Sequence, residues 1–207
     1  MPKNIEYPTD SRLYEKARVI LVKLANKHDI NLRQNYNLVT KKLIRKLGGY
    51  LHAKQMKRAN KLIKHLKVIV GRIQRDISRK IENNSNKNKK AELVKIFEPA
   101  LNQTTRLLAQ QKKDKNKLYS LHEPEVICIN KGKSHKRSEF GSKVSTVITA
   151  KQGLVINNES LQGNPYDGHT LKPALAKAEE ITGIKIKEAA VDKVYRGHKK
   201  EKASLKP

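Results

Sequence analysis

The chain is poor in the residues that build disulfides, aromatic platforms and membrane spans. Cys128 is its single cysteine, so no internal disulfide can form, and a reducing cytosol is the expected compartment. No apolar run approaches the roughly 20 residues that a bilayer requires, and the first residues lack the apolar core of a signal peptide. Tryptophan is absent, and seven Tyr and two Phe are too scattered to form a stacking platform for single strands. We therefore expect an intracellular protein without a membrane partner.

Acidic side chains are also scarce. The 207 residues include 46 Lys or Arg against 19 Asp or Glu, which gives a net charge of +27. So large an excess opposes compaction through self-repulsion and favours a polyanionic partner. Double-stranded DNA and structured RNA both fit this charge, and a DNA partner would place the protein in the cytoplasm at the nucleoid. Apolar residues make up 37%, so we expect a thin core.

The N-terminal part of the chain has the apolar periodicity of helices. A first helix is expected over about 10–28, capped by Thr9 or Asp10, with its apolar residues on one face. A second helical piece is expected over about 36–47, where the glycine pair at 48–49 should interrupt it.

The longest helix is expected from about residue 53 to residue 81. Apolar residues step along it by three or four positions, close to a heptad: Ala59, Ile63, Leu66, Val70, Ile73, Ile77 and Ile81. This seam predicts lengthwise packing on a partner helix, which is either the first helix folded back or a helix of a second protomer. Between residues 41 and 80 there are fourteen Lys or Arg and one acid, Asp76, so the side away from the seam should be strongly positive.

A polar, low-complexity stretch over 83–90 is expected to be a flexible joint. Another amphipathic helix should follow over about 91–111, and Pro99 should kink it or split it in two. The expected organisation is a basic helical region over 1–82, a polar linker with an amphipathic helix over 83–117, and a further domain over 118–207.

From about residue 118 the period of 3.6 gives way to short apolar runs. Candidate strands are 125–129, 141–149, 154–158 and 187–192. A helix over about 171–182, with Thr170 as its cap and a proline in its first turn, precedes the last of them. Strands followed by a helix and another strand predict an α/β unit. The expected fold class is mixed α and β, with a helical hairpin or coiled-coil-like N-terminal half.

Six segments, spread over about residues 5–198, resemble insertion-sequence transposases of the acidic-triad (DDE) class. They are YPTDSRL at 7–13, YLHAKQMKRA at 50–59, YSLHEPEV at 119–126, KGKSHK at 131–136, GNPYDGHTL at 163–171 and VDKVYRGH at 191–198. Each is short, but their order along the chain makes the resemblance specific. It implies a partial RNase H-like domain over 118–207, a double-stranded DNA partner, and self-association or association with full-length transposase.

The resemblance also implies a metal-dependent reaction. The family cuts and rejoins phosphodiesters with two divalent ions, Mg²⁺ or Mn²⁺, held by three carboxylates. Asp192 matches the second of these, at the end of a short apolar run and before a basic turn, and it is the candidate catalytic and metal-ligating residue. The alternative is an exposed aspartate that caps a turn. The first carboxylate would belong before Met1 and the third beyond Pro207, so we expect a catalytically inactive fragment without a tightly bound metal.

Candidate DNA contacts come from the basic helical surface and from the basic segments around 131–137 and 196. They are Lys42, Arg45, Lys46, Lys54, Lys57, Arg58, Lys61, Lys64, Arg72, Arg75, Lys131, Lys133, Lys136 and Arg196. The 131–137 segment can equally be a solvated loop.

Asp167 and His169 lie in the motif that precedes the last expected helix. Asp167 would form the turn or cap the helix end, and a substrate contact is the alternative. The role of His169 stays open between the same possibilities.

Three functions compete at this point. The first is a DNA-binding remnant of a transposase that is catalytically incomplete alone. The second is a non-catalytic DNA-binding or oligomerising module that modulates full-length transposase. The third is a basic RNA-binding protein of the ribosomal type, which charge alone supports.

Overall fold

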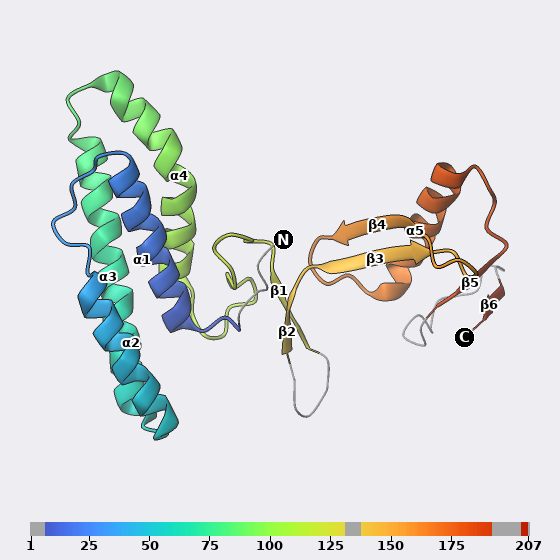
Figure 1. The fold of residues 1–207 in the computed structure, drawn as a ribbon, viewed down its shortest axis with the longest axis horizontal. Helices are drawn as coiled ribbons and strands as arrows, with labels where there is room; N and C mark the ends of the chain where they lie inside the picture. The colour runs from blue at the N-terminus through green and yellow to red at the C-terminus, as the bar shows by residue number, and fades with distance from the viewer. Residues whose placement is uncertain (1–6, 131–137, 192–203, 207) are drawn as a thin grey trace. The chain divides into compact units, whose positions relative to one another are not determined.

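A computed structural model describes residues 7–130, 138–191 and 204–206 of the chain. They form a helix-rich protein of mixed α and β structure with two compact units, Met1–Pro124 and Glu125–Pro207, here named the helical unit and the second unit. Figure 1 shows their elements. No helix of the described ranges is long and apolar enough to cross a membrane.

Four helices build the helical unit: α1 (Asp10–Lys27), α2 (Asn37–His52), α3 (Met56–Glu82) and α4 (Lys87–Ala109). The prediction for the first helix is confirmed, because α1 begins after Thr9, whose hydroxyl accepts a hydrogen bond from the backbone N–H of Arg12.

The prediction that the glycine pair interrupts the second helix is wrong. Helix α2 runs through Gly48 and Gly49 to His52, and the carbonyl of Gly49 accepts from the N–H of Ala53 at 3.0 Å. Each glycine costs roughly 1 kcal/mol relative to alanine in a helix. The packing of α2 on α3, in which Leu47 is buried, outweighs that cost.

The seam of α3 forms the centre of the hydrophobic core. Six of its seven residues are 4% exposed or less, and Ile63 is partly buried. Helices α1 and α4 of the same chain pack against α3, and they supply Leu21 and Phe97, both fully buried. The expectation that the first helix covers the seam is therefore confirmed.

Helix α4 begins earlier than expected and is not split. Asn86 caps it by accepting from the N–H groups of Asn88 and Lys89, so the last four residues of the expected joint are its first turn. The helix continues through Pro99 because Leu93 and Leu107, on either side of the proline, are buried in one core.

The second unit contains short strands in two-stranded sheets and one helix. The elements are β1 (Ile127–Asn130), β2 (Ser138–Gly141), β3 (Lys143–Ile148), β4 (Val155–Leu161), α5 (Asp167–Thr182), β5 (Glu188–Ala190) and β6 (Ser204–Lys206). Strands β1 and β2 pair antiparallel, as do β3 and β4, whereas β5 and β6 are parallel. The expected strand over 141–149 corresponds to β3, with narrower bounds, whereas β2 was not expected.

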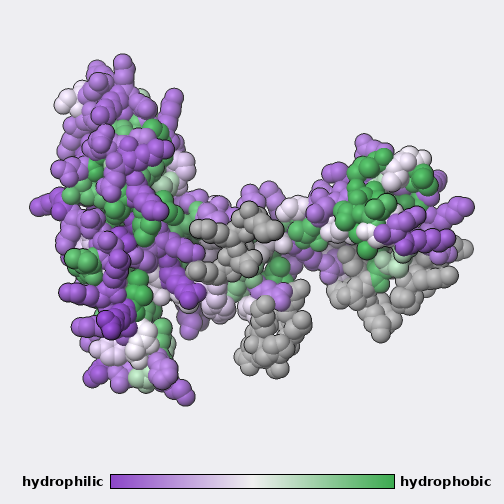
Figure 2. Space-filling model, viewed as in Figure 1, coloured by the Kyte–Doolittle hydropathy of each residue, from purple (hydrophilic) through white to green (hydrophobic). Residues whose placement is uncertain are grey.

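Helix α5 packs on β3 and β4 and begins four residues before the expected start. Thr170 lies inside the helix, where its hydroxyl donates to the carbonyl of Asp167 at 2.8 Å, so the expected capping role is wrong. The described part of this unit buries little apolar surface, and Val126, Ala174 and Ala178 are its buried hydrophobic residues. Figure 2 shows hydrophobic side chains at its surface, whereas the helical unit presents a mostly hydrophilic exterior.

Candidate nucleic-acid interface

Cationic side chains form a row along the solvent side of α3. Its six members are Lys57, Lys61, Lys64, Arg72, Arg75 and Arg79, all exposed. With 3.6 residues per turn, these positions share the face of the helix opposite the apolar seam. Val68, which is 46% exposed, fills the gap between Lys64 and Arg72. The row, here named the α3 stripe, extends about 33 Å at roughly 1.5 Å per residue.

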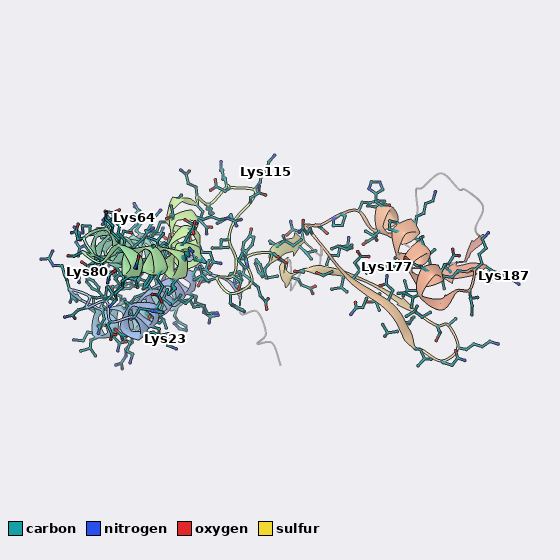
Figure 3. The ribbon with its side chains drawn as sticks, turned by 90° about the horizontal axis from the view of Figure 1, so that it is seen from above. Lys23, Lys64, Lys80, Lys115, Lys177 and Lys187 are labelled. Atoms are coloured by element: carbon teal, nitrogen blue, oxygen red, sulfur yellow. The ribbon has the colours of Figure 1, made fainter. Side chains whose placement is uncertain are left out.

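Helix α2 adds cations beside the stripe because it packs on α3. Lys42, Arg45 and Lys46 are exposed on α2, and Lys54 is exposed in the corner between the two helices, with a left-handed φ of 55°. All ten of the candidate DNA contacts on α2, the corner and α3 are therefore accessible to a partner. Figure 3 shows Lys64 and Lys80 on α3 and Lys23 on α1 among the side chains that project from the helical unit.

Arg58 lies on another side of α3 and is held by local contacts. Its Nη1 donates to Oε1 of Gln55 at 2.9 Å, and its guanidinium lies 5.9 Å from the ring centroid of Tyr50. The second contact is a cation–π interaction between the end of α2 and the start of α3. Arg58 thus steadies the corner while its side chain stays exposed.

Asp76 is the acid in this basic surface, and it is 8% exposed. Its Oδ2 accepts from the backbone N–H of Arg33 at 3.0 Å and pairs with Nζ of Lys80 at 3.3 Å, while Oδ1 lies 3.8 Å from Nη2 of Arg79. Burial raises the pKa of Asp76, but the Arg33 N–H, Lys80 and Arg79 together lower it further, so its pKa lies below 3.8. The carboxylate therefore stays ionised and fixes the segment before α2 to α3.

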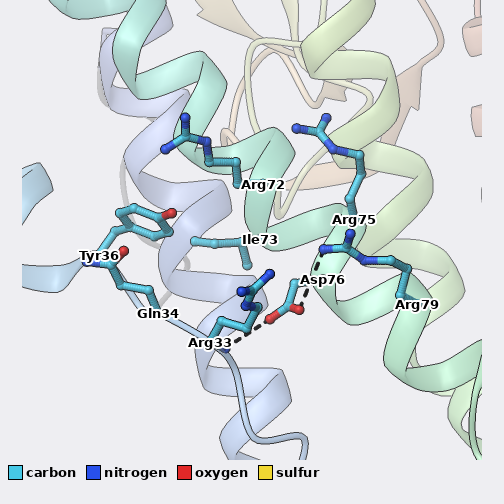
Figure 4. A pocket seen from close by; sticks show the side chains of 8 residues that line it. All are labelled: Arg33, Gln34, Tyr36, Arg72, Ile73, Arg75, Asp76 and Arg79. Carbon is cyan, nitrogen blue, oxygen red and sulfur yellow. Dashed lines mark hydrogen bonds and ion pairs between the residues drawn. The ribbon is translucent and has the colours of Figure 1, made fainter.

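Sequence reasoning missed Arg33, Tyr36 and Arg79 as site residues. Together with Arg72, Arg75 and Asp76 they line a cavity of about 530 Å³ between α3 and the segment before α2 (Figure 4). The fourteen-cation count included Arg79, but Arg33 lies outside the helical periodicity that the count relied on, so no pattern in the sequence placed it there.

The motif at 163–171 spans the start of α5 and makes contacts within the second unit. Asp167 begins α5, and its Oδ1 lies 2.6 Å from Nζ of Lys143. The same Nζ donates a hydrogen bond to the carbonyl of Pro165 at 2.5 Å. The ring of His169 makes an edge contact with the ring of Tyr166, with centroids 5.7 Å apart. These contacts join α5 to β3.

The remaining candidates lie outside the described residues: Asp192, Lys131, Lys133, Lys136 and Arg196. Within residues 7–130, 138–191 and 204–206, no three His, Cys, Asp or Glu side chains gather in a way that could hold a metal ion. The candidate ligand Asp192 is not among these residues, so a metal role for its carboxylate stays a prediction.

Comparison with known proteins gives one partial relative of unknown role. Over 54 residues the chain is 50% identical to an uncharacterized protein, ORF8 in the nfe locus of Rhizobium meliloti, and the match covers 26% of each protein. The chain thus matches about a quarter of that relative's length. No protein-family model matches, and no solved structure matches.

Proposed function

We propose that this chain binds double-stranded DNA through the α3 stripe and the neighbouring cations of α2, and that it is related to insertion-sequence transposases. The α3 stripe is the observation that carries the proposal. Six exposed cations, spaced at helical intervals over about 33 Å, match the length of roughly one turn of B-DNA.

The chemistry of such contacts is electrostatic. Each Lys or Arg that neutralises a phosphate releases condensed counterions, so the affinity falls as salt rises, with a slope of roughly −0.9 per contact on a log–log plot. Contacts of this kind position a protein on the duplex without reading its sequence. The proposed activity is therefore a salt-sensitive, mostly sequence-independent attachment to DNA.

The transposase relationship rests on the ordered motifs, and we extend it to an RNase H-like second unit. In their order along the chain, an antiparallel hairpin, a helix packed on it and a further strand (β3, β4, α5 and β5) resemble part of that fold, although β5 pairs with β6 and not with the hairpin. In such a unit Asp192 would be a metal ligand for Mg²⁺ or Mn²⁺. Self-association through the seam has less support, because α1 and α4 of the same chain cover it.

The test is fluorescence anisotropy with a labelled duplex over a range of salt concentrations. Wild type is compared with two triple variants. One is Lys57→Ala/Lys61→Ala/Lys64→Ala, in the α3 stripe, and the other is a matched control, Lys23→Ala/Lys27→Ala/Lys95→Ala. Both triple variants lose three positive charges from exposed sites. The stripe variant should bind more weakly and with a salt slope smaller by about 2–3, whereas the control should stay near wild type.

An equal loss of affinity in the two triple variants would show that binding depends on net charge alone. It would contradict a specific interface on α3. Preferential binding to structured RNA over duplex at moderate salt would favour an RNA-binding protein instead. Metal-dependent cutting of the duplex that Asp192→Ala abolishes would overturn the expectation of a catalytically inactive chain.

A further inference from the structure

We infer that the cavity lined by Arg33, Arg72, Arg75 and Arg79 is a binding site for a phosphate ester, which we name the arginine pocket. Three of these arginines, Arg72, Arg75 and Arg79, belong to the α3 stripe, so the inference deepens the proposed function and rests in part on it. Arg33, from the segment before α2, adds a fourth guanidinium that the stripe lacks. Four guanidinium groups and one carboxylate, Asp76, line a volume of about 530 Å³.

The charge of the pocket is not balanced by its own residues. The Asp76 carboxylate already accepts a hydrogen bond from the backbone N–H of Arg33 and forms ion pairs with the side chains of Lys80 and Arg79. Within residues 7–130, the guanidinium groups of Arg33, Arg72 and Arg75 make no ion pair with a carboxylate. Like charges that line one hollow repel each other, so an anion that enters it relieves the repulsion.

The type of cation favours phosphate among anions. All four basic side chains that line the pocket are arginines, although lysine is common on this surface. The planar guanidinium offers two parallel N–H donors that match two phosphate oxygens, whereas an ammonium acts as a point charge. Figure 4 shows the arginines arranged around the hollow, with Asp76 between Arg33 and Arg79.

The size of the pocket favours an ester over free phosphate. Pockets of roughly 300–1,000 Å³ hold ligands much larger than a single phosphate group. Tyr36 and Ile73 add an aromatic and an aliphatic side chain to the wall, against which a sugar or base could lie. The same chemistry fits a phosphodiester of a nucleic-acid strand and a free nucleotide.

The wall that carries Arg33 and Tyr36 is held in place from both sides. Asp76 of α3 binds the N–H of Arg33, and Nη1 of the buried Arg18 on α1 donates to the carbonyl of Asn35 at 3.2 Å. Tyr36 has a φ of 56°, an unfavourable conformation for a residue with a side chain, which these neighbours maintain. The pocket therefore exists before its ligand arrives.

The experiment follows the arginine side-chain N–H resonances of the full chain by NMR during titration with inorganic phosphate, with sodium chloride at matched ionic strength as the reference. The resonances of Arg33 and Arg72 should shift and saturate with phosphate, and that of Arg106, exposed on α4, should not saturate. In Arg33→Lys/Arg72→Lys the apparent affinity should fall about tenfold, although the charge is unchanged. Arg106→Lys, which changes an arginine outside the proposed interface, is the control and should bind phosphate as wild type does.

The hydrogen bond of Asp76 is kept in the Arg33→Lys change, because it is made to the backbone N–H of Arg33 and not to its side chain. Small, linear shifts at every arginine, or an unchanged affinity in Arg33→Lys/Arg72→Lys, would overturn the pocket. If the pocket binds phosphate but the chain does not bind duplex DNA, the proposed function is refuted and the inference of a phosphate site stands.

Two further arms separate the sources of the phosphate in the saturable case. A blunt duplex without terminal phosphates that displaces inorganic phosphate from Arg33 assigns the pocket to an internal phosphodiester. Displacement by a nucleoside monophosphate, without competition from the duplex, assigns it to a free nucleotide.

Discussion

The carboxylate of Asp76 accepts a hydrogen bond at 3.0 Å from the backbone N–H of Arg33, which lies 43 positions earlier in the chain. The contact joins the C-terminal part of α3 to the segment between α1 and α2. The Asp76 carboxylate therefore has a structural purpose within a basic surface. The main effect of the Asp76 carboxylate is to hold the segment between α1 and α2 against α3. Its effect on the charge of the surrounding cations is secondary.

The first prediction concerns Asp76→Asn and pH. The pKa of Asp76 is lowered in the folded state, so its contribution to stability is present above the ordinary value of 3.8 and is lost as pH falls through the folded value. At neutral pH the variant should be less stable by about 1–3 kcal/mol, since hydrogen bonds to charged groups contribute about that much. Urea denaturation of both proteins across the acid range measures the difference, which should shrink as the wild-type carboxylate protonates.

Asp29→Asn is the control for this prediction. Asp29 is exposed with a φ of 55°, a conformation that asparagine also tolerates. A pH dependence of stability that is the same in Asp76→Asn and in wild type would contradict the anchoring role.

The second prediction concerns Gly71, on α3. A Cβ at this position would lie 3.2 Å from Nη1 of Arg75 and 3.7 Å from Cδ1 of Leu108. The end of the Arg75 side chain can move, and alanine gains roughly 0.5–1 kcal/mol over glycine inside a helix. Gly71→Ala should therefore be neutral or slightly stabilising while it displaces the Arg75 guanidinium.

A larger residue at the same place should have the opposite effect. Gly71→Leu would press on Leu108 of α4, and overpacking of this kind costs about 1–3 kcal/mol. Thermal denaturation of the two variants and of wild type gives the order of their stabilities. A Gly71→Leu protein as stable as Gly71→Ala would show that α3 and α4 do not pack closely here.

The third prediction concerns the core. Phe97 on α4 is fully buried, and its ring meets the ring of His28 edge-on with centroids 5.9 Å apart. Phe97→Ala should destabilise the helical unit by about 3–5 kcal/mol, because it removes a large buried side chain and leaves a cavity. Val94→Ala, on the exposed side of the same helix, should change stability by about 0.5 kcal/mol or less. Denaturant titration followed by circular dichroism compares the two.

The fourth prediction concerns the unequal stability of the two units. Among the described residues, the helical unit buries six of the seven residues of the α3 seam, whereas the second unit buries Val126 and two alanines as its apolar residues. Backbone amides of β4 and α5 should exchange with solvent through openings of lower free energy than those of α3. Native-state hydrogen exchange resolved by residue tests this, and equal protection in α3 and α5 would contradict it.

Periodicity located the helices well because burial itself is periodic along them. The α3 seam is visible in sequence, and the structure buries six of its seven positions. Boundaries that depend on local breakers were less predictable: α2 passes through Gly48 and Gly49, and α4 passes through Pro99. In both helices the tertiary contacts outweigh a local cost that the sequence displays.

The arginine pocket shows the other limit of sequence reading. Arg72 and Arg75 belong to a periodic helix face, and their exposure followed from it. Arg33 reaches the same place through a hydrogen bond to Asp76 across the fold, and no spacing in the chain encodes that neighbour. Two of the six transposase-like segments, at 131–136 and around Asp192, lie outside the described residues, so their roles stay predictions.

The corner between α2 and α3 has a consequence for how the cations act together. Three residues, 53–55, connect the helices, and their N–H groups donate to the carbonyls of Gly49, Leu51 and Tyr50. Because the connection is short and hydrogen-bonded, it fixes the two helices relative to each other. The distances between the lysines of α2 and those of α3 are therefore constant. A rigid polyanion of matching pitch can meet them simultaneously, and a flexible one must first adopt their shape.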